Sequence, residues 1–423
     1  MSTGVPGDAR RILIAQGLRA GAYGFGAVLL GATLHRRGYS STEAGLVLGA
    51  VLMGTVTASL AIGCFGDRWG RRRCYVALYL ALAAVGIAFA FAGEVWILIV
   101  AALSGALSTE VVESGPFTSL EQAMLATDLD GHERIRGFGL YNAVAAAAGS
   151  VGALAAAIPG LLRDEWSGAP PAQRYFLVFV PIALAGAVVA RRLSPRVEAA
   201  APHATSADRG LTRSRPAVRR LAALFAIDSF GGGFTVQSFI AYWLSVHYGA
   251  SVATLGFVFF AVGLLQTVSF LLAVRLATRF GLLRTMVFTH LPSNLLLALI
   301  PVAPTLGVAI ALLLGRTVLS QMDVPTRQAY VMALVDPGER TAAAAYTNTA
   351  RYVVRPVAPV LAGLAQSVAL GLPFVLAGSI KTGYDLVLWR WFSHVELRDG
   401  EGLALDGEQI SSRSQVGPEG QPL

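Results

Sequence analysis

The chain has 423 residues, of which 55% are hydrophobic and only 14% are charged, and its mean hydropathy is +0.60. Soluble domains carry about 25% charged residues, and a water-soluble fold of this size could not remove so much apolar side chain from water. The composition therefore excludes a soluble globular protein and predicts one that lies in a lipid bilayer. The net charge of +8 would suggest nucleic-acid binding in a soluble protein. Here the arginines lie between apolar runs, so no nucleic-acid partner is expected.

Taken in chain order, twelve apolar stretches are long enough to cross a bilayer as helices, which requires about 20 residues each. The polar start of the chain runs directly into the first stretch, so no cleavable signal is expected. The sequence therefore predicts an all-α, multi-pass membrane protein. The predicted spans are residues 12–34, 43–65, 74–93, 95–119, 138–162, 175–193, 221–245, 253–277, 285–303, 305–325, 341–367 and 371–392.

Arginines gather in every second connection between these spans, starting with the connection after the second span. Basic residues are enriched in cytoplasmic loops, so this asymmetry predicts that both termini lie in the cytoplasm and that the protein lies in the cell (inner) membrane. The connections on the predicted cytoplasmic side hold Arg68, Arg71, Arg72, Arg73, Arg134, Arg136, Arg191, Arg192, Arg196, Arg209, Arg213, Arg215, Arg219, Arg220, Arg279, Arg284, Arg327 and Arg340.

The second half of the chain repeats the first. Gly38 and Gly249 both follow a long apolar span, and 249 − 38 = 211; the same shift brings Gly70 to Gly281. A later block repeats with 328 − 122 = 206, which aligns Gln122 with Gln328. Two six-span bundles related by such a repeat are a transporter plan, with the substrate at their interface. The predicted organisation is an N-terminal bundle (1–193), a basic cytoplasmic linker (194–220), a C-terminal bundle (221–392) and a flexible cytoplasmic tail (393–423).

The connection after the second span reads Gly-Cys-Phe-Gly-Asp-Arg-Trp-Gly-Arg-Arg-Arg over residues 63–73. It resembles the signature G-x-x-x-D-R-x-G-R-[RK]-[RK] of the major facilitator superfamily, at the place where that family keeps it. The resemblance implies two pseudo-symmetric six-helix bundles and a loop that latches them on the cytoplasmic side. The second copy has Thr278 where the first has Asp67. The residues to which the resemblance assigns gating are Gly63, Asp67, Arg68, Gly70 and Arg71; Arg72 and Arg73 also fit simple positive-inside anchors.

Of the ionisable residues inside the predicted spans, ten are candidates for functional or structural roles, because charge there is costly and usually faces a cavity or an opposite charge. Two interpretations stay open for them: contact with substrate or protons in a central cavity, or salt bridges that hold each bundle together. The inversion of Arg19 and Glu110 in the first half against Asp228 and Arg316 in the second favours a cavity. We assign Arg19, Glu110, Asp228, Arg316, Arg351 and Arg355 to a cavity that binds substrate or protons, and Glu113, Asp323, Lys381 and Asp385 to structural roles.

Local spacing adds two expectations about pairing. Lys381, the only lysine, precedes Asp385 by one helical turn, so the two are expected to neutralise each other. The sequence Asp336-Pro337-x-Glu339 is expected to cap the start of the helix that follows it.

Motifs of other classes are absent from the sequence. It has no G-x-x-x-x-G-K-[ST] for an ATP-driven pump and no nucleophile motif for a hydrolase, so an enzyme is not expected, nor is a metal or cofactor. The sequence predicts a secondary carrier that moves a small solute by alternating access, with proton-coupled efflux as one form of it. An uncoupled facilitator and a non-transporting receptor or scaffold remain as alternatives, and the substrate is not determined.

Overall fold

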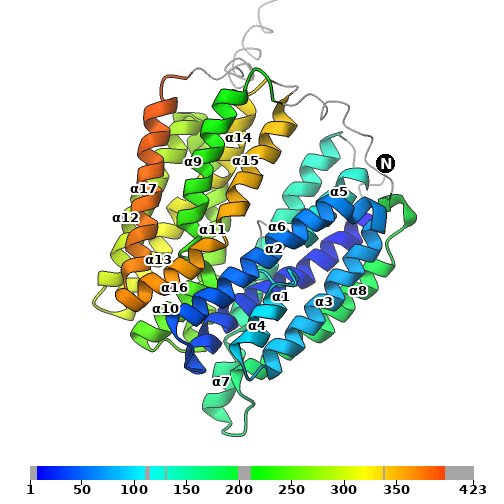
Figure 1. Ribbon diagram of the computed structural model, residues 1–423, viewed down its shortest axis with the longest axis vertical. Helices are drawn as coiled ribbons and strands as arrows, with labels where there is room; N and C mark the ends of the chain where they lie inside the picture. Colours follow the sequence, from blue (N-terminus) through cyan, green and yellow to red (C-terminus); the bar gives the residue numbers. More distant parts are fainter. Residues whose placement is uncertain (1–6, 110–114, 129–130, 199–210, 337–338, 396–423) are drawn as a thin grey trace, which may run out of the picture.

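A computed structural model describes residues 7–109, 115–128, 131–198, 211–336 and 339–395, and every regular element in these ranges is a helix. Two bundles stand side by side, one for each half of the chain (Figure 1). The first contains α1 (Gly7–Arg36), α2 (Ser41–Trp69), α3 (Arg71–Phe91), α4 (Val95–Ala102), α5 (Pro116–Asp128), α6 (Gly131–Ala155), α7 (Ile158–Glu165), the 3₁₀ turn η1 (Ala172–Val178) and α8 (Phe179–Arg191). After η2 (Pro195–Glu198), the second contains α9 (Arg215–Gly233), α10 (Gln237–Tyr248), α11 (Val252–Phe280), α12 (Leu282–Leu299), η3 (Ile300–Val302), α13 (Leu306–Ser320), α14 (Asp323–Leu334), α15 (Arg340–Val354), α16 (Val357–Val368) and α17 (Leu372–Phe392).

Among the described residues, eight helices are long and apolar enough to cross a membrane. The other four predicted spans do not form a single long apolar helix. Three of them are each divided between two helices: α4 and α5, α9 and α10, and α15 and α16. The fourth, α17, is one helix that carries buried charges. Helix α9 already begins at Arg215, inside the predicted linker. Its extra turns precede the apolar stretch because Pro216 in the first turn favours a helix start.

The sequence repeat reappears as repeated backbone geometry. Ser40 caps α2 by accepting the N–H of Glu43 at 3.3 Å, and Ser251, 211 residues later, caps α11 by accepting the N–H of Thr254 at 3.1 Å. Gly70 and Gly281, again 211 apart, join long helices with φ of +90° and +87°. Positive φ is accessible to glycine without a steric penalty, which is why both turns use it.

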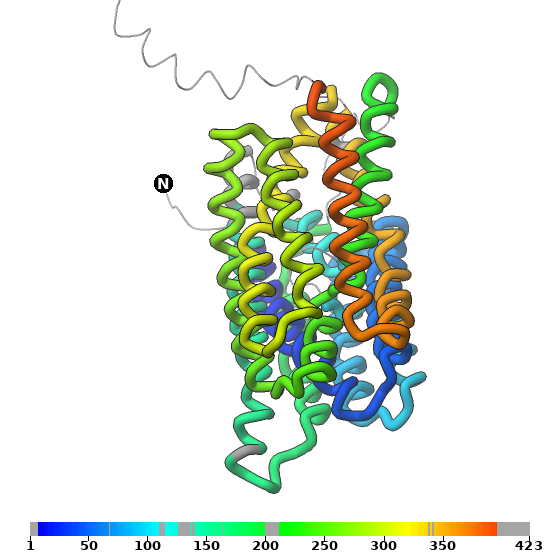
Figure 2. The backbone as a smooth tube through the Cα atoms, turned by 90° about the vertical axis from the view of Figure 1, so that its left-hand side faces the viewer, coloured from blue at the N-terminus to red at the C-terminus, as the bar shows by residue number. Residues whose placement is uncertain are grey.

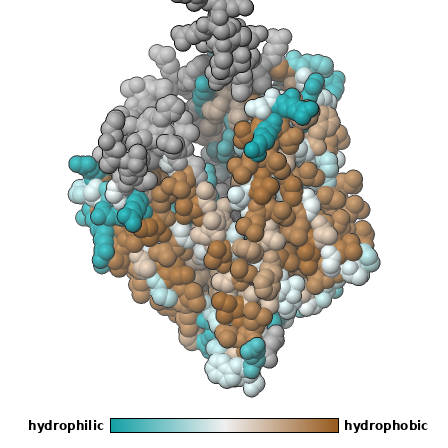
Figure 3. Space-filling model, turned by 180° about the vertical axis from the view of Figure 1, so that it is seen from behind, coloured by the Kyte–Doolittle hydropathy of each residue, from teal (hydrophilic) through white to brown (hydrophobic). Residues whose placement is uncertain are grey.

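Apolar side chains cover much of the face of the molecule shown in Figure 3, where they are brown. Large residues such as Leu271, Leu295 and Val302 are 62–72% exposed, a pattern that would cause aggregation in water. In a bilayer the same surface contacts lipid tails.

The two halves pack closely at the end of the molecule away from the linker (Figures 1 and 2). The Ser238 hydroxyl of α10 donates to the Ala27 carbonyl of α1 at 2.7 Å, and the Tyr242 hydroxyl donates to the Tyr39 carbonyl at 3.0 Å. Glycines allow the approach: a Cβ on Gly31 would lie 2.2 Å from the Ser238 carbonyl oxygen, and one on Gly363 would lie 2.3 Å from that of Ser41. The halves are therefore locked together at this end, which we call the closed end; the opposite end is the linker end.

Candidate functional site

A cavity of about 730 Å³ lies between the two halves. Residues aligned by the internal repeat meet in its wall: Gln122 and Gln328 from α5 and α14, and Asn142 and Asn348 from α6 and α15. Each half therefore contributes the same pair of amides, as expected for a binding site on the pseudo-symmetry axis. The break between α15 and α16, at Arg355 and Pro356, also lines this cavity.

A second cavity of about 250 Å³ adjoins the first and lies mainly in the C-terminal half. Phe270, Val324, Arg351 and Arg355 line both cavities, so these side chains lie between two adjacent spaces. Its described lining contains five basic and two acidic side chains. These are Arg316, Arg327, Arg351, Arg355 and Lys381, with Asp228 and Asp323.

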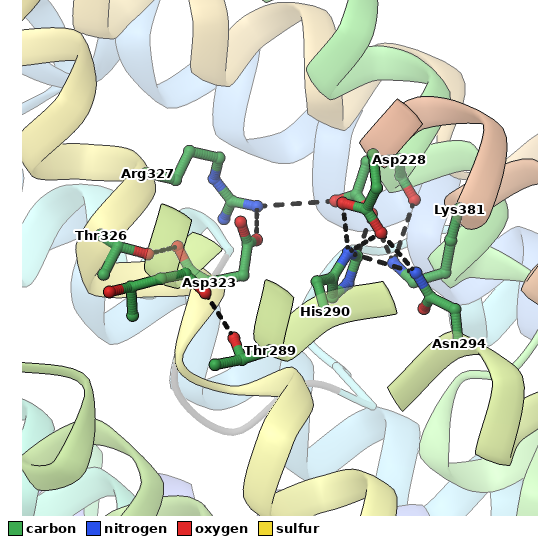
Figure 4. Close-up of polar contacts among 10 residues, drawn as sticks. Asp228, Thr289, His290, Asn294, Asp323, Thr326, Arg327 and Lys381 are labelled. Carbon is green, nitrogen blue, oxygen red and sulfur yellow. Dashed lines mark hydrogen bonds and ion pairs between the residues drawn. The ribbon is translucent and has the colours of Figure 1, made fainter. Parts of the chain in front are cut away.

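Several charged side chains at the wall of the second cavity form one connected cluster (Figure 4). Lys381 of α17 donates to Asp228 of α9 at 2.5 Å. Arg327 of α14 lies 2.6 Å from Asp323 and 3.5 Å from Asp228. Each of these side chains is at least nine-tenths buried, so the pairs are shielded from solvent.

The N-terminal half has its own buried ion pair, which lies away from both cavities. The Arg19 guanidinium of α1 donates to Glu121 of α5 at 2.7 Å. Tyr75 and Tyr141 donate to the same carboxylate at 2.7 and 2.5 Å. Arg19 and Glu121 are 1% and 0% exposed and line neither cavity. The geometry therefore matches the salt-bridge interpretation of Arg19.

The two ion pairs are equivalent by the repeat, with their charges exchanged. Glu121 and Arg327 are related by 327 − 121 = 206, the shift that aligns Gln122 with Gln328. Arg19 and Asp228, on α1 and α9, are 228 − 19 = 209 residues apart, within two residues of equivalence by the shift of 211. The expected exchange of charges between the halves is present. It involves Arg19 with Glu121 and Asp228 with Arg327, whereas the sequence suggested Glu110 and Arg316 as the second members. Glu121 was missed although it directly precedes the repeated block.

Two of the predicted site residues lie outside the described residues, and a third lines a cavity. Glu110 and Glu113 belong to the undescribed segment 110–114. Arg316 of α13 lines the second cavity, and its Nε is buried; no hydrogen bond or ion pair joins it to another residue in the part of the chain described. Arg316 is thus a cation presented to a cavity.

The expected pairing of Lys381 with Asp385 is wrong. Lys381 reaches across to Asp228, while Asp385 contacts α12: both of its oxygens lie 3.0 Å from His290 Nδ1, and Asn294 donates to it at 2.8 Å. The packing of α17 against α9 on one side and α12 on the other separates the two side chains. Sequence reasoning did not select His290 or Asn294, although both are polar residues within a predicted span.

The signature loop contacts the linker in this conformation. Gly63 and Arg68 are exposed near the end of α2, and the Asp67 side chain lies outside the described part of the structure. The N–H groups of Arg71 and Arg72 donate to Glu198 at 2.7 and 3.1 Å, which satisfies the start of α3.

A second glutamate holds the other end of the linker. The expected role of Glu339 as a cap for α15 is wrong, because its carboxylate accepts the N–H groups of Thr212, Arg213 and Ser214 just before α9, at 2.7–3.0 Å. The Thr212 hydroxyl, followed by these N–H groups, lowers the pKa of Glu339 from 4.5 to about 2. Each end of the linker is thereby fixed to its own bundle.

Known proteins share this architecture. The profile of the Major Facilitator Superfamily matches residues 12–380. An uncharacterized membrane protein of Saccharomyces cerevisiae is 26% identical over 416 residues, which cover 90% of this chain and 93% of that protein.

Solved transporters superpose on both halves. The nucleoside transporter NupG has a TM-score of 0.71 at 13% identity and covers 92% of this chain and 98% of its own. The inward-open xylose transporter XylE of E. coli gives 0.69 at 14%, covering 96% and 99%. A bacterial homolog of the human lysosomal transporter Spinster gives 0.70 at 15%, covering 91% and 97%. At these identities the similarity shows the fold alone, and it confirms the predicted helical membrane fold of two six-span bundles. The chain belongs to the Major Facilitator Superfamily of membrane transporters.

Proposed function

We propose that this protein carries a small anionic solute across the membrane by alternating access, binding it in the two adjacent cavities. The observation that carries the proposal is Arg316, a cation at the cavity wall that bonds to no other residue in the described part of the chain. An anion in this cavity would supply the partner that Arg316 lacks among the described residues.

The arrangement of the halves supports alternating access. They are locked at the closed end by the glycine contacts, while the larger cavity lies between them nearer the linker end. Rocking one half against the other would open the closed end around a fixed binding site. Gln122, Asn142 and their repeat equivalents are proposed to bind the polar part of the solute together with Arg316, Arg351 and Arg355.

We also propose that the linker end faces the cytoplasm in the cell membrane and that protons drive the transport. The basic linker and the arginines of the signature loop support this orientation. Two buried carboxylates at the wall of the second cavity and Asp385 behind them support proton coupling, because such groups are costly within a membrane unless they are paired or protonated. Reporter domains fused after residue 395 and within the α2–α3 connection should both report the cytoplasm.

Arg316→Met tests the substrate class. The purified protein is screened by thermal shift against carboxylates and phosphate esters, with neutral solutes of the same size as controls. Hydrogen bonds to charged groups contribute about 1.5–3 kcal/mol, so the variant is expected to bind the anionic hit about 10- to 150-fold more weakly. Arg275→Met, on the exposed surface of α11, is the matched control. Equal affinity of wild type and Arg316→Met would contradict the proposed site.

Flux in proteoliposomes separates the carrier from its rivals. A carrier moves the bound anion and exchanges it across the membrane. An uncoupled facilitator would show flux that ignores an imposed pH gradient, and a receptor would bind without flux.

A further inference from the structure

Asp385 is a fully buried carboxylate of the C-terminal half, and no lysine or arginine is among its described partners. It is 0% exposed, and its described hydrogen-bond partners are His290 and Asn294, both from α12. Neither partner carries a fixed positive charge. Beside a neutral His290, an ionised carboxylate at this depth would contact no cation, which is unfavourable within a membrane.

A count of charges in the cluster leads to the same point. Asp228 and Asp323 are matched by Lys381 and Arg327, at 2.5 and 2.6 Å. Asp385 is the third carboxylate of the cluster, and no described lysine or arginine forms an ion pair with it. One proton, on Asp385 or on His290, would neutralise its charge.

His290 is placed to hold and transfer that proton. Its Nδ1 lies 3.0 Å from both oxygens of Asp385, and its Nε2 lies 3.9 Å from Asp228 Oδ1. The imidazole thus stands between two carboxylates. Asn294 donates to Asp385 at 2.8 Å and orients it toward the ring.

Of the two residues, His290 is the one that reaches the solute space. His290 and Asp228 line the second cavity, whereas Asp385 lies behind them and lines neither cavity. The other charged or titratable groups around the ring come from three of the helices packed against α12: Lys381 and Tyr384 from α17, Asp323 and Arg327 from α14, and Arg316 from α13. A proton can therefore enter from the cavity through His290, with Asp228 beside the entry.

We propose that His290 and Asp385 form a site that binds one exchangeable proton, which passes to and from the cavity at His290 and Asp228. The assignment deepens the proposed function, because it rests on the second cavity being part of the solute path. An anion bound near Arg316 adds negative charge next to the pair and favours its protonated form. By reciprocity, a bound proton favours the anion, which links the two.

Counting protons on the purified protein tests this without a substrate. Wild type and Asp385→Asn are titrated in detergent from about pH 7 upward, where ordinary aspartates are already ionised. Wild type is expected to release one proton more than the variant, whether the proton resides on Asp385 or on His290. Asp8→Asn is the matched control, since Asp8 is a buried aspartate near the linker end that already has Arg11 as a partner at 2.8 Å. Its release curve should match that of wild type.

Equal proton release from wild type and Asp385→Asn overturns the proposal. If Asp385→Asn does not give a folded protein, Asp385→Leu, which replaces the carboxylate by an apolar group, repeats the comparison. The outcome is independent of the transport assay: absence of anion flux would remove the proposed function and leave the proton count unaffected, and a missing proton would leave the carrier function in place.

Discussion

Replacing Gly31 by alanine is expected to drive the protein out of the conformation described here. Gly31 of α1 faces α10 at the closed end. An added Cβ would lie 2.2 Å from the Ser238 carbonyl oxygen and 2.8 Å from both the Ala241 Cβ and the Tyr242 nitrogen. Two of these three atoms are backbone, so no side-chain rotation relieves the clash. The two halves must separate at this point.

The size of the effect follows from the cost of overpacking. Inserting a methyl group into a closely packed contact typically costs about 1–3 kcal/mol. The clash of the added methyl group disappears when the closed end opens. The cost therefore destabilises only the present conformation. The ratio of this conformation to the one open at the other end should fall about 5- to 150-fold.

Cysteine labelling measures the shift. Thr349, in the wall of the larger cavity, is replaced by cysteine in a background that carries Cys64→Ser and Cys74→Ser. The maleimide reaction at position 349 should slow when Gly31→Ala is added, because closing the linker end covers the cavity. Gly383→Ala is the control, since no atom lies within 4 Å of the added Cβ. If Gly31→Ala labels as fast as the control, the close approach at Gly31 does not hold the closed end together.

Three further outcomes are expected. Glu121→Gln leaves Arg19 buried without its counter-charge, so the free energy of unfolding in detergent should fall by about 3–5 kcal/mol. An unchanged unfolding temperature would show that the ion pair does not stabilise the protein. Donors before α9, first among them the Thr212 hydroxyl, hold the pKa of Glu339 at about 2, below its ordinary 4.5. Its contribution to stability is therefore present above about pH 4.5 and lost as the pH falls toward 2, so the difference in Tm between wild type and Glu339→Gln should shrink over that range. Gly70→Ala forces a side chain into φ of +90° and should lower stability by about 1–3 kcal/mol, measured as a lower Tm.

The elements that depend on local sequence could be predicted. Apolar length located the spans, because each span must satisfy its backbone hydrogen bonds within one helix. The shift of 211 residues located turns whose geometry is the same in both halves, as Gly70 and Gly281 show. These features need only a few neighbouring residues, so they are visible in the sequence.

The partners of the buried charges could not be predicted in the same way. Arg19 pairs with Glu121, 102 residues away in the chain. Lys381 pairs with Asp228, 153 residues away, and not with Asp385 one helical turn away. Such choices depend on the rotation of each helix about its axis and on which helices pack against it. A spacing of four residues places two side chains on one face but does not decide which neighbour each one meets.

By itself, the amino-acid sequence determined that the chain crosses a bilayer repeatedly and that its two halves share one plan, because apolar length and repeated turn residues act locally. Only the tertiary structure decided that Arg316 faces a cavity, that Arg19 does not, and that His290 separates two aspartates. Those facts arise from the packing of α9, α12, α13, α14 and α17, which brings together residues that no local pattern connects.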